Sequence, residues 1–294
     1  MVAKDERSLK IAMSGATGFV GTNLGKAFQA RGWKIVPLGR KDFMAAPEIL
    51  ADRLQGADVV VNLAGAPIIG RWTREYKQII YDSRIDVTGK IVSACSLMDR
   101  SPELLISTSA VGYYSSQGVH TEAEHVKADD FLGRLTGDWE KEALKAGNIG
   151  MRVVIFRFGI VLGKGGGALQ QMLIPFQYGL GGTIGDGAQP VSWVHMDDLT
   201  RAFQTAIEEV TYKGIYNLTA PHPTTNKGLT AVLGKALHRP VFFRVPEFAL
   251  RLRFGEGARV LTSGQAVIPR RLLDSGFKFQ FTEINEAVLD CLSD

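Results

Sequence analysis

The chain has 294 residues, of which 45% are hydrophobic and 22% are charged, values that exclude a disordered, collagen-like or coiled-coil protein. Its net charge is +4 and its basic residues are scattered, which argues against nucleic acid or a membrane surface as the partner. Two cysteines cannot form a disulfide framework, and residues 1–10 contain no apolar segment typical of a secretion signal. We therefore expect a cytoplasmic protein.

Short apolar runs alternate with helical patterns from residue 9 to about residue 160. Runs that are apolar throughout and separated by helices are typical of a parallel sheet covered on both faces. This pattern predicts an α/β fold with a doubly wound parallel sheet. The expected strands are residues 9–14, 34–38, 58–63, 104–108 and 152–158, and the expected helices are residues 19–31, closed by Gly32, and 75–97.

The composition changes after Gly163. Residues 163–187 are rich in glycine, and five of the eleven prolines follow residue 220, while a βαβ-like stretch lies between them at residues 191–218. We expect a larger domain made of residues 9–163 and 191–219, and a smaller lobe made of residues 164–190 and 220–294.

A glycine-rich segment joins the first expected strand to the first expected helix. Gly15 permits a tight turn, Gly18 allows backbone to approach a pyrophosphate, and Gly21 lets the helix pack closely on the sheet. The exposed N–H groups at the helix start, at Thr17, Phe19 and Val20, then face the phosphates. The alternative is a glycine-rich turn without a ligand. A similar glycine pattern at residues 163–168 comes later in the chain than most of the expected strands, and we interpret it as a loop beside the site.

The end of the second expected strand favours NADP(H) over NAD(H). NAD enzymes of this fold carry an acidic residue there for the ribose 2′-hydroxyl. Here Gly39 takes that place and Arg40 follows, so a 2′-phosphate meets no repulsion and gains a bidentate partner. The alternative for Arg40 and Lys41 is a solvated surface pair.

Several segments together resemble the extended short-chain dehydrogenase/reductase superfamily, in particular an atypical branch described as NAD-dependent epimerase/dehydratase family proteins, some of them labelled cell-division inhibitors. The resemblance implies a Rossmann domain that binds NADP(H) and a smaller C-terminal substrate lobe. These segments are residues 15–21, 62–65, 71–72, 83–84, 107–114, 157–163, 193–195, 216–217 and 267–277.

The resemblance also implies roles for individual residues. Leu63, Ala64 and Gly65 would line the adenosine and its ribose. Arg84 would reach the cofactor phosphates, its alternative being an ion pair with Asp82 or Asp86. Phe158 and Val161 belong to a segment that would present backbone to the nicotinamide. No metal site is expected, since no ligand motif is present.

The superfamily's catalytic pair, a Tyr with a Lys four residues later, does not occur at any of the seven tyrosines. Aligning Glu140 with the superfamily's helix glutamate places Leu132 and Thr136 at the Tyr and Lys positions. Ser109 matches the Ser/Thr that polarises the substrate oxygen. Two other sources of the proton stay open, Tyr113 or Tyr114 after the strand, and water or the substrate itself.

We interpret three further residues as structural. His195 has a structural rather than catalytic role, Asp198 caps a helix running to about residue 209, and Glu140 lies on a solvated helix face.

Two functions follow from these observations. The first is an NADP(H)-dependent oxidoreductase or epimerase-like protein that acts on an unidentified small or sugar-like substrate. The second is a noncatalytic NADPH-binding sensor. A homodimer is compatible with either function.

Overall fold

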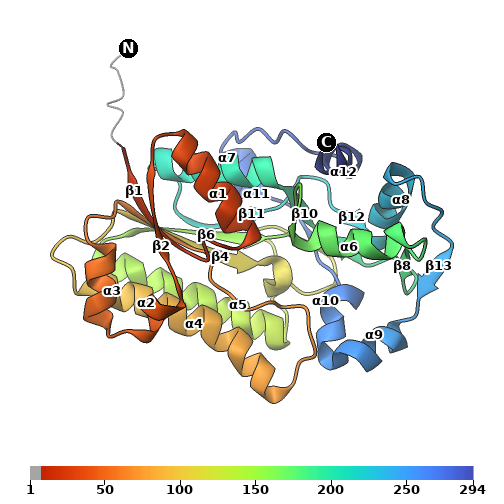
Figure 1. Cartoon of the computed structure of the whole chain (residues 1–294), viewed down its shortest axis with the longest axis horizontal. Helices are drawn as coiled ribbons and strands as arrows, with labels where there is room; N and C mark the ends of the chain where they lie inside the picture. The colour runs from red at the N-terminus through yellow and green to blue at the C-terminus, as the bar shows by residue number, and fades with distance from the viewer. Residues whose placement is uncertain (1–7, 294) are drawn as a thin grey trace, which may run out of the picture.

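Six parallel strands form one central sheet in the order β2–β1–β3–β4–β6–β11 (Figure 1). The computed structural model describes residues 8–293, so most of the charged N-terminal segment lies outside the described residues. Helices pack on both faces of the sheet, which confirms the predicted doubly wound α/β fold. The strands of the sheet are β1 (Lys10–Ser14), β2 (Lys34–Leu38), β3 (Val59–Asn62), β4 (Leu104–Ala110), β6 (Arg152–Phe158) and β11 (Gly214–Leu218).

The remaining strands form four two-stranded pairs outside the central sheet. Three pairs are parallel, β7 with β10, β8 with β13, and β5 with β14, and the pair of β9 with β12 is antiparallel. Their bounds are β5 (Val119–His120), β7 (Ile160–Leu162), β8 (Gly182–Ile184), β9 (Pro190–Val191), β10 (Trp193–His195), β12 (Thr224–Thr225), β13 (Phe243–Val245) and β14 (Ala266–Val267).

Two hydrophobic clusters separate the central sheet from its helices. One contains α1, α7 and α11, whose buried side chains include Phe28, Phe203 and Leu272. The other contains α2 to α5. The helices are α1 (Phe19–Ala30), α2 (Arg40–Met44), α3 (Pro47–Leu54), α4 (Arg74–Ser96), α5 (Phe131–Leu144), α6 (Gly167–Gln177), α7 (Met196–Glu208), α8 (Asn226–Ala236), α9 (Glu247–Phe254), α10 (Arg259–Thr262), α11 (Arg270–Asp274) and α12 (Ile284–Leu292), with short 3₁₀ turns η1 (Val111–Tyr113), η2 (Lys145–Ile149) and η3 (Gly255–Ala258).

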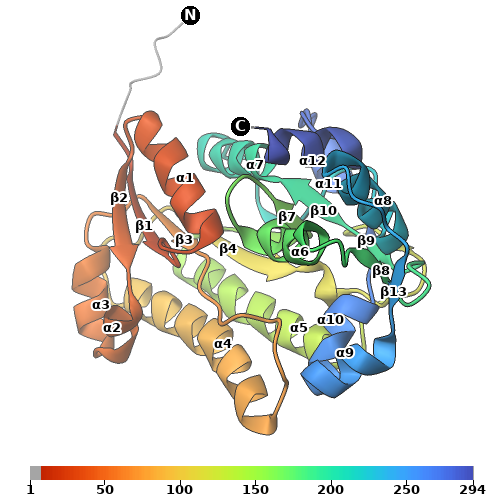
Figure 2. The ribbon, with the colours of Figure 1, turned by 45° about the vertical axis from the view of Figure 1, so that its right-hand side comes forward.

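A third hydrophobic cluster joins α6, α8 and α12 around the buried ring of Trp193. These helices gather on the right-hand side of Figure 2, away from β1 and β2, with β8, β13 and α9 at the outer rim. The predicted boundaries of the two lobes stay a prediction. Among residues 8–293, no helix is both long and apolar enough to cross a membrane.

Candidate functional site

The carboxyl end of β1 lies between the carboxyl ends of β2 and β3. Ser14 pairs in register with Leu38 on one side and with Asn62 on the other. The chain order of the strands reverses at this point, which is where ligands bind in doubly wound sheets. The residues that follow these strands, including Gly15 and Gly39, are therefore brought together at one edge.

The three glycines of the first turn differ in what they make possible. Gly15 has a φ of +66°, and a Cβ there would lie 2.8 Å from the carbonyl oxygen of Leu63. A Cβ on Gly21 would lie 2.2 Å from the carbonyl oxygen of Gly15, so only glycine lets α1 begin so close to β1. Thr17 and Gly18 are exposed, which leaves the backbone at the start of α1 accessible. The geometry matches a turn that admits a phosphate group.

A buried polar network holds this edge of the sheet together. The Ser14 hydroxyl donates to the side-chain oxygen of Asn62 at 2.6 Å and accepts from the backbone N–H groups of Leu63 and Ala64. The Asn62 amide in turn donates to the Thr88 hydroxyl at 2.8 Å. The sequence assigned no role to Ser14 or Asn62, although a polar residue at the end of an apolar strand was the available signal. The network fixes the turn at residues 63–65.

The second glycine-rich segment packs against the first one through Phe19. A Cβ on Gly163, Gly166 or Gly167 would lie 3.0, 2.4 or 2.7 Å from atoms of the Phe19 ring. The loop expected beside the site therefore lies directly on the first residue of α1. Val20, Phe158 and Val161 are half-buried and pack on the cluster under the sheet.

Arg84 lies against the turn that follows β3. Its guanidinium donates to the carbonyl oxygen of Ala66 at 3.0 Å, and a Cβ on Gly65 would lie 2.9 Å from its Cζ. Burial lowers the pKa of Arg84 to about 10, so it stays charged at neutral pH. Among the described residues it pairs with no carboxylate, and the alternative of an ion pair with Asp82 or Asp86 is wrong. The site thus holds a half-buried cation whose hydrogen-bond partners among the described residues are neutral oxygens.

Arg40 begins α2 beside the glycine turn and is exposed. Within residues 8–293 it makes no ion pair. The nearest acid in the chain, Asp42, is engaged elsewhere, since it accepts from the Gly39 N–H at 2.7 Å and lies 3.3 Å from Arg53. The Arg40 guanidinium is free to meet a ligand.

Glu140 is buried, so its predicted place on a solvated helix face is wrong. It forms a bidentate ion pair with Arg157 on β6, in which both N–O distances are 2.7 Å. Burial alone would lower the pKa of Arg157, but the hydrogen bonds and charge of Glu140 raise it above its ordinary value. α5 turns Glu140 towards the sheet because that face of the helix packs on β4 and β6.

The same carboxylate engages Ser109. The Ser109 hydroxyl donates to Glu140 Oε1 at 2.6 Å, and the side chain is only 3% exposed. A hydroxyl has one hydrogen to donate. Ser109 is therefore not placed to donate to a substrate oxygen in this arrangement.

The two tyrosines after β4 have different surroundings. Tyr114 is fully buried, accepts from Arg157 at 2.7 Å and donates to Asn217 at 2.6 Å, and burial raises its pKa. Tyr113 is half-buried, and the Arg157 guanidinium lies 3.5 Å from the centre of its ring. No other described residue forms a hydrogen bond with the Tyr113 hydroxyl. Of the two, only Tyr113 keeps its hydroxyl available.

The residues that were aligned with the superfamily's Tyr and Lys, Leu132 and Thr136, take part in local packing. Leu132 packs against Gly112 in η1, where a Cβ would lie 3.3 Å from it. The Thr136 hydroxyl donates to the carbonyl oxygen of Leu132 at 2.7 Å. Neither side chain supplies a proton to a ligand.

His195 and Asp198 are structural, but not in the expected arrangement. His195, not Asp198, caps α7, since its Nδ1 accepts from the Asp197 N–H at 3.3 Å. Asp198 is buried and accepts from the N–H groups of Gln280 and Phe281 at 2.8 and 2.9 Å. Burial lowers the pKa of His195, against the raising effect of Asp197 and Asp290.

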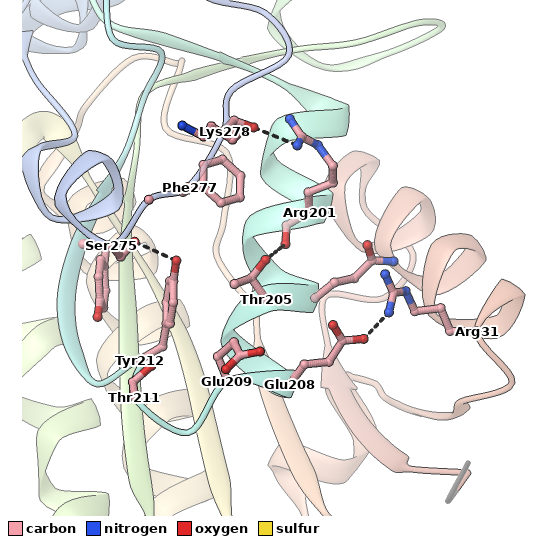
Figure 3. A pocket seen from close by; sticks show the side chains of 13 residues that line it. Arg31, Arg201, Thr205, Glu208, Glu209, Thr211, Tyr212, Ser275, Phe277 and Lys278 are labelled. Carbon is pink, nitrogen blue, oxygen red and sulfur yellow. Dashed lines mark hydrogen bonds and ion pairs between the residues drawn. The ribbon is translucent and has the colours of Figure 1, made fainter. Parts of the chain in front are cut away.

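A pocket of about 630 Å³ lies at the opposite edge of the sheet (Figure 3). Arg31 follows α1, Glu208 ends α7 and Tyr212 precedes β11, so these residues mark the amino ends of the strands. It contains none of the expected cofactor residues. In the described part of the chain, no group of three or more His, Cys, Asp or Glu side chains could hold a metal ion.

Two family models match the chain. Residues 11–219 match the NAD dependent epimerase/dehydratase family, and residues 245–291 match a domain of unknown function, DUF1731. The first match covers the sheet and the site at its carboxyl edge.

Relatives along nearly the whole chain are also epimerase family proteins. "Epimerase family protein SDR39U1 homolog, chloroplastic" from Arabidopsis thaliana is 39% identical and the match covers 97% of this chain and 87% of the relative. "Epimerase family protein YfhF" from Bacillus subtilis is 35% identical over 97% and 99% of the two chains. These matches extend the likeness beyond the nucleotide-binding segment.

Solved structures share the fold. The crystal structure of human epimerase family protein SDR39U1 (isoform 2) with NADPH has a TM-score of 0.88 at 32% identity and covers 96% of this chain and 99% of that one. A UDP-glucuronic acid 4-epimerase from Bacillus cereus has a TM-score of 0.78 at 18% identity, over 96% and 97% of the chains, which shows the fold alone.

Proposed function

Because the chain belongs to the NAD dependent epimerase/dehydratase family, we propose that it binds NADP(H) and catalyses an oxidoreductase or epimerase-like step on a small or sugar-like substrate. The observation that carries the proposal is Arg84, a half-buried cation beside Gly65 that pairs with no carboxylate among residues 8–293. A cation that is partly removed from water and lacks a counter-ion is stabilised by an anionic ligand. A pyrophosphate bound between this arginine and the start of α1 would supply the missing negative charge.

Arg40 supports NADP(H) rather than NAD(H). Gly39 provides no carboxylate to repel a 2′-phosphate, and Arg40 is exposed with its guanidinium free. The NADPH bound to the human relative is consistent with this choice.

The cofactor preference is tested by replacing Arg40 with Asp. We expect a loss of NADPH affinity of about 10- to 100-fold, the range of one charge-assisted contact, with NADH affinity kept or raised. Isothermal titration with each dinucleotide gives the ratio. Lys34→Asp, at the opposite end of the same strand, is the matched control. An unchanged NADPH-to-NADH ratio in Arg40→Asp contradicts the assignment.

For the proton we assign Tyr113. When bound, the nicotinamide would supply or accept hydride at the substrate carbon. In the reducing direction, Tyr113 would donate its phenolic proton to the substrate carbonyl oxygen, giving the alcohol, and regain a proton from water. The Arg157 guanidinium lies 3.5 Å from the centre of the Tyr113 ring, and it would stabilise the Tyr113 phenolate until the phenol is protonated again.

A noncatalytic NADPH-binding sensor is the second candidate, and Ser109 is the observation in its favour. The hydroxyl expected to polarise a substrate oxygen is 3% exposed and donates to Glu140.

NADPH fluorescence of the loaded protein, followed while a pooled metabolite extract is added, separates the two functions. Turnover through Tyr113 predicts signal loss in wild type and Ser109→Ala but not in Tyr113→Phe. Retained fluorescence in all three proteins, with NADPH still bound, favours the sensor.

We propose that the protein is cytoplasmic, consistent with its two free cysteines.

A further inference from the structure

Large apolar side chains stand in solvent along β13 and α9. Phe248 and Leu252 are 73% and 79% exposed, and they lie four residues apart on α9, so they share one face of the helix. Phe242, just before β13, and Phe243, its first residue, are 85% and 53% exposed. We name these four residues the β13–α9 rim. Such a concentration of exposed aromatic and Leu side chains marks an interaction surface.

The rim lies in a basic segment of the chain. Residues 235–259 contain six Lys or Arg and two Glu, so this segment has the same net charge as the whole chain and the remainder is neutral. Both acids are already paired, Glu247 with Arg251 at 3.3 Å and Glu256 with Lys77. Four cations of the segment pair with no carboxylate among the described residues, and these are Lys235, Arg239, Arg244 and Arg253. An anion would find an excess of unneutralised charge here.

We propose that the β13–α9 rim docks on an anionic lipid surface. Phe248 and Leu252 would enter the boundary between head groups and acyl chains, and the neighbouring arginines would meet lipid phosphates. Reversible membrane binding needs both an apolar and a basic element, and this segment provides both. Arg244 and Arg253 lie in the same segment as the exposed apolar side chains.

A second copy of the chain is a poorer occupant of the same surface. In a two-fold interface each patch faces its own copy. The four unpaired cations would then oppose the same four cations, with no free acid in the segment to balance them. Like charges brought together in this way oppose association.

The place of the rim is compatible with docking. Figures 1 and 2 both show β13 and α9 at the periphery, on the far side of the molecule from α1 and β2. α9 lies inside the segment that matches the domain of unknown function. Docking through this face would leave the glycine turn at the start of α1 open to solvent.

The experiment is sedimentation of the full chain with vesicles of phosphatidylcholine alone or with about 30% phosphatidylglycerol, an anionic lipid. We expect the wild type to sediment only with the anionic vesicles, and less so as salt is added. Phe248→Ser with Leu252→Ser should bind at least about tenfold more weakly. Arg244→Gln with Arg253→Gln should bind about 25-fold more weakly, since each charge near the surface contributes about fivefold.

Matched variants elsewhere on the surface control for general loss of charge or apolar area. Leu289→Ser, at an exposed position on α12, and Lys26→Gln with Lys213→Gln should bind as the wild type does. Circular dichroism establishes whether each variant is folded. If Phe248→Ser with Leu252→Ser does not fold, the result for Arg244→Gln with Arg253→Gln decides the proposal. The proposal is wrong if the wild type ignores anionic vesicles, binds pure phosphatidylcholine equally well, or loses no more binding in the rim variants than in the controls. It is also wrong if the rim variants turn a dimer into a monomer without changing vesicle binding.

Discussion

Removing the Glu140 carboxylate should destabilise the protein severely. Glu140→Ala deletes the acceptor of two hydrogen bonds from Arg157, both of 2.7 Å, and of one from Ser109, of 2.6 Å. The Arg157 side chain is 3% exposed, so its charge would stay buried without a partner. Breaking such a pair costs about 3–5 kcal/mol. That is a large part of the roughly 5–15 kcal/mol by which a protein is stable.

Urea denaturation followed by circular dichroism measures this cost as a change in the free energy of unfolding. Glu142→Ala is the matched control, because Glu142 lies on the same helix and pairs with Lys145 at the surface, at 2.5 Å. Exposed pairs of this kind contribute about 0–1 kcal/mol. The control should therefore unfold within about 1 kcal/mol of the wild type.

A double variant tests whether the unpaired charge is the cause. Glu140→Leu with Arg157→Met removes both charges and keeps apolar volume, and such replacements are often neutral. We expect it to be more stable than Glu140→Ala. The reasoning fails if Glu140→Ala costs less than about 1 kcal/mol, or if the double variant is no more stable than the single one.

Three further predictions concern other parts of the site. In the urea denaturation assay, Gly21→Ala should lower the free energy of unfolding by about 1–3 kcal/mol and weaken NADPH binding, because its Cβ would lie 2.2 Å from a carbonyl oxygen. Gly25→Ala is the control, since a Cβ there meets nothing within 4 Å, and its free energy of unfolding should be unchanged or higher. Because the pKa of His195 is lowered in the folded protein, the unfolded chain is protonated first, and the free energy of unfolding should fall as pH drops below about 6.5. His195→Asn keeps a side-chain acceptor for the helix cap and should show a smaller fall between pH 7.5 and 5.5, whereas an equal fall in both proteins would remove His195 as the cause. Tyr114→Phe should cost about 1–3 kcal/mol on thermal or urea unfolding, since Arg157 and Asn217 each lose a buried partner, and an unchanged stability would show that water replaces the hydroxyl.

The sequence predicted the elements whose signals are local. The bounds expected for the second and fifth strands, Lys34–Leu38 and Arg152–Phe158, are those of β2 and β6. For β6 the reason is that a continuous apolar run records burial on both faces, whereas β2 lies at the edge of the sheet and buries only Leu38. The turn at Gly15 was predictable for a similar reason, since its glycines lie within seven residues and each has a steric cause. The predicted closing glycine of the first helix, Gly32, has a φ of +76°.

The parts that could not be predicted depend on partners distant in sequence. Glu140 looks solvated beside Lys141, and only the packing of α5 on the sheet brings it to Arg157, 17 residues later. Asp198 resembles a helix cap because it precedes an apolar helical pattern. In the structure, however, its carboxylate oxygens accept hydrogen bonds from backbone N–H groups more than 80 residues away. The engagement of Ser109 by Glu140 follows from the same packing. Charged residues inside a fold are assigned by tertiary contacts that no local pattern records.

The strand order of the sheet has a consequence for how the chain can assemble during synthesis. Once β1 and β2 have paired, each later strand joins the open edge left by the one before it, β3 on β1, β4 on β3, β6 on β4 and β11 on β6. No strand has to insert between two earlier neighbours, so assembly can follow translation from the N-terminus. The same order means that a ribosome stalled before residue 214 leaves β6 as an unpaired edge whose interior residues are buried in the finished sheet. Truncated products of this protein are therefore expected to aggregate through that strand.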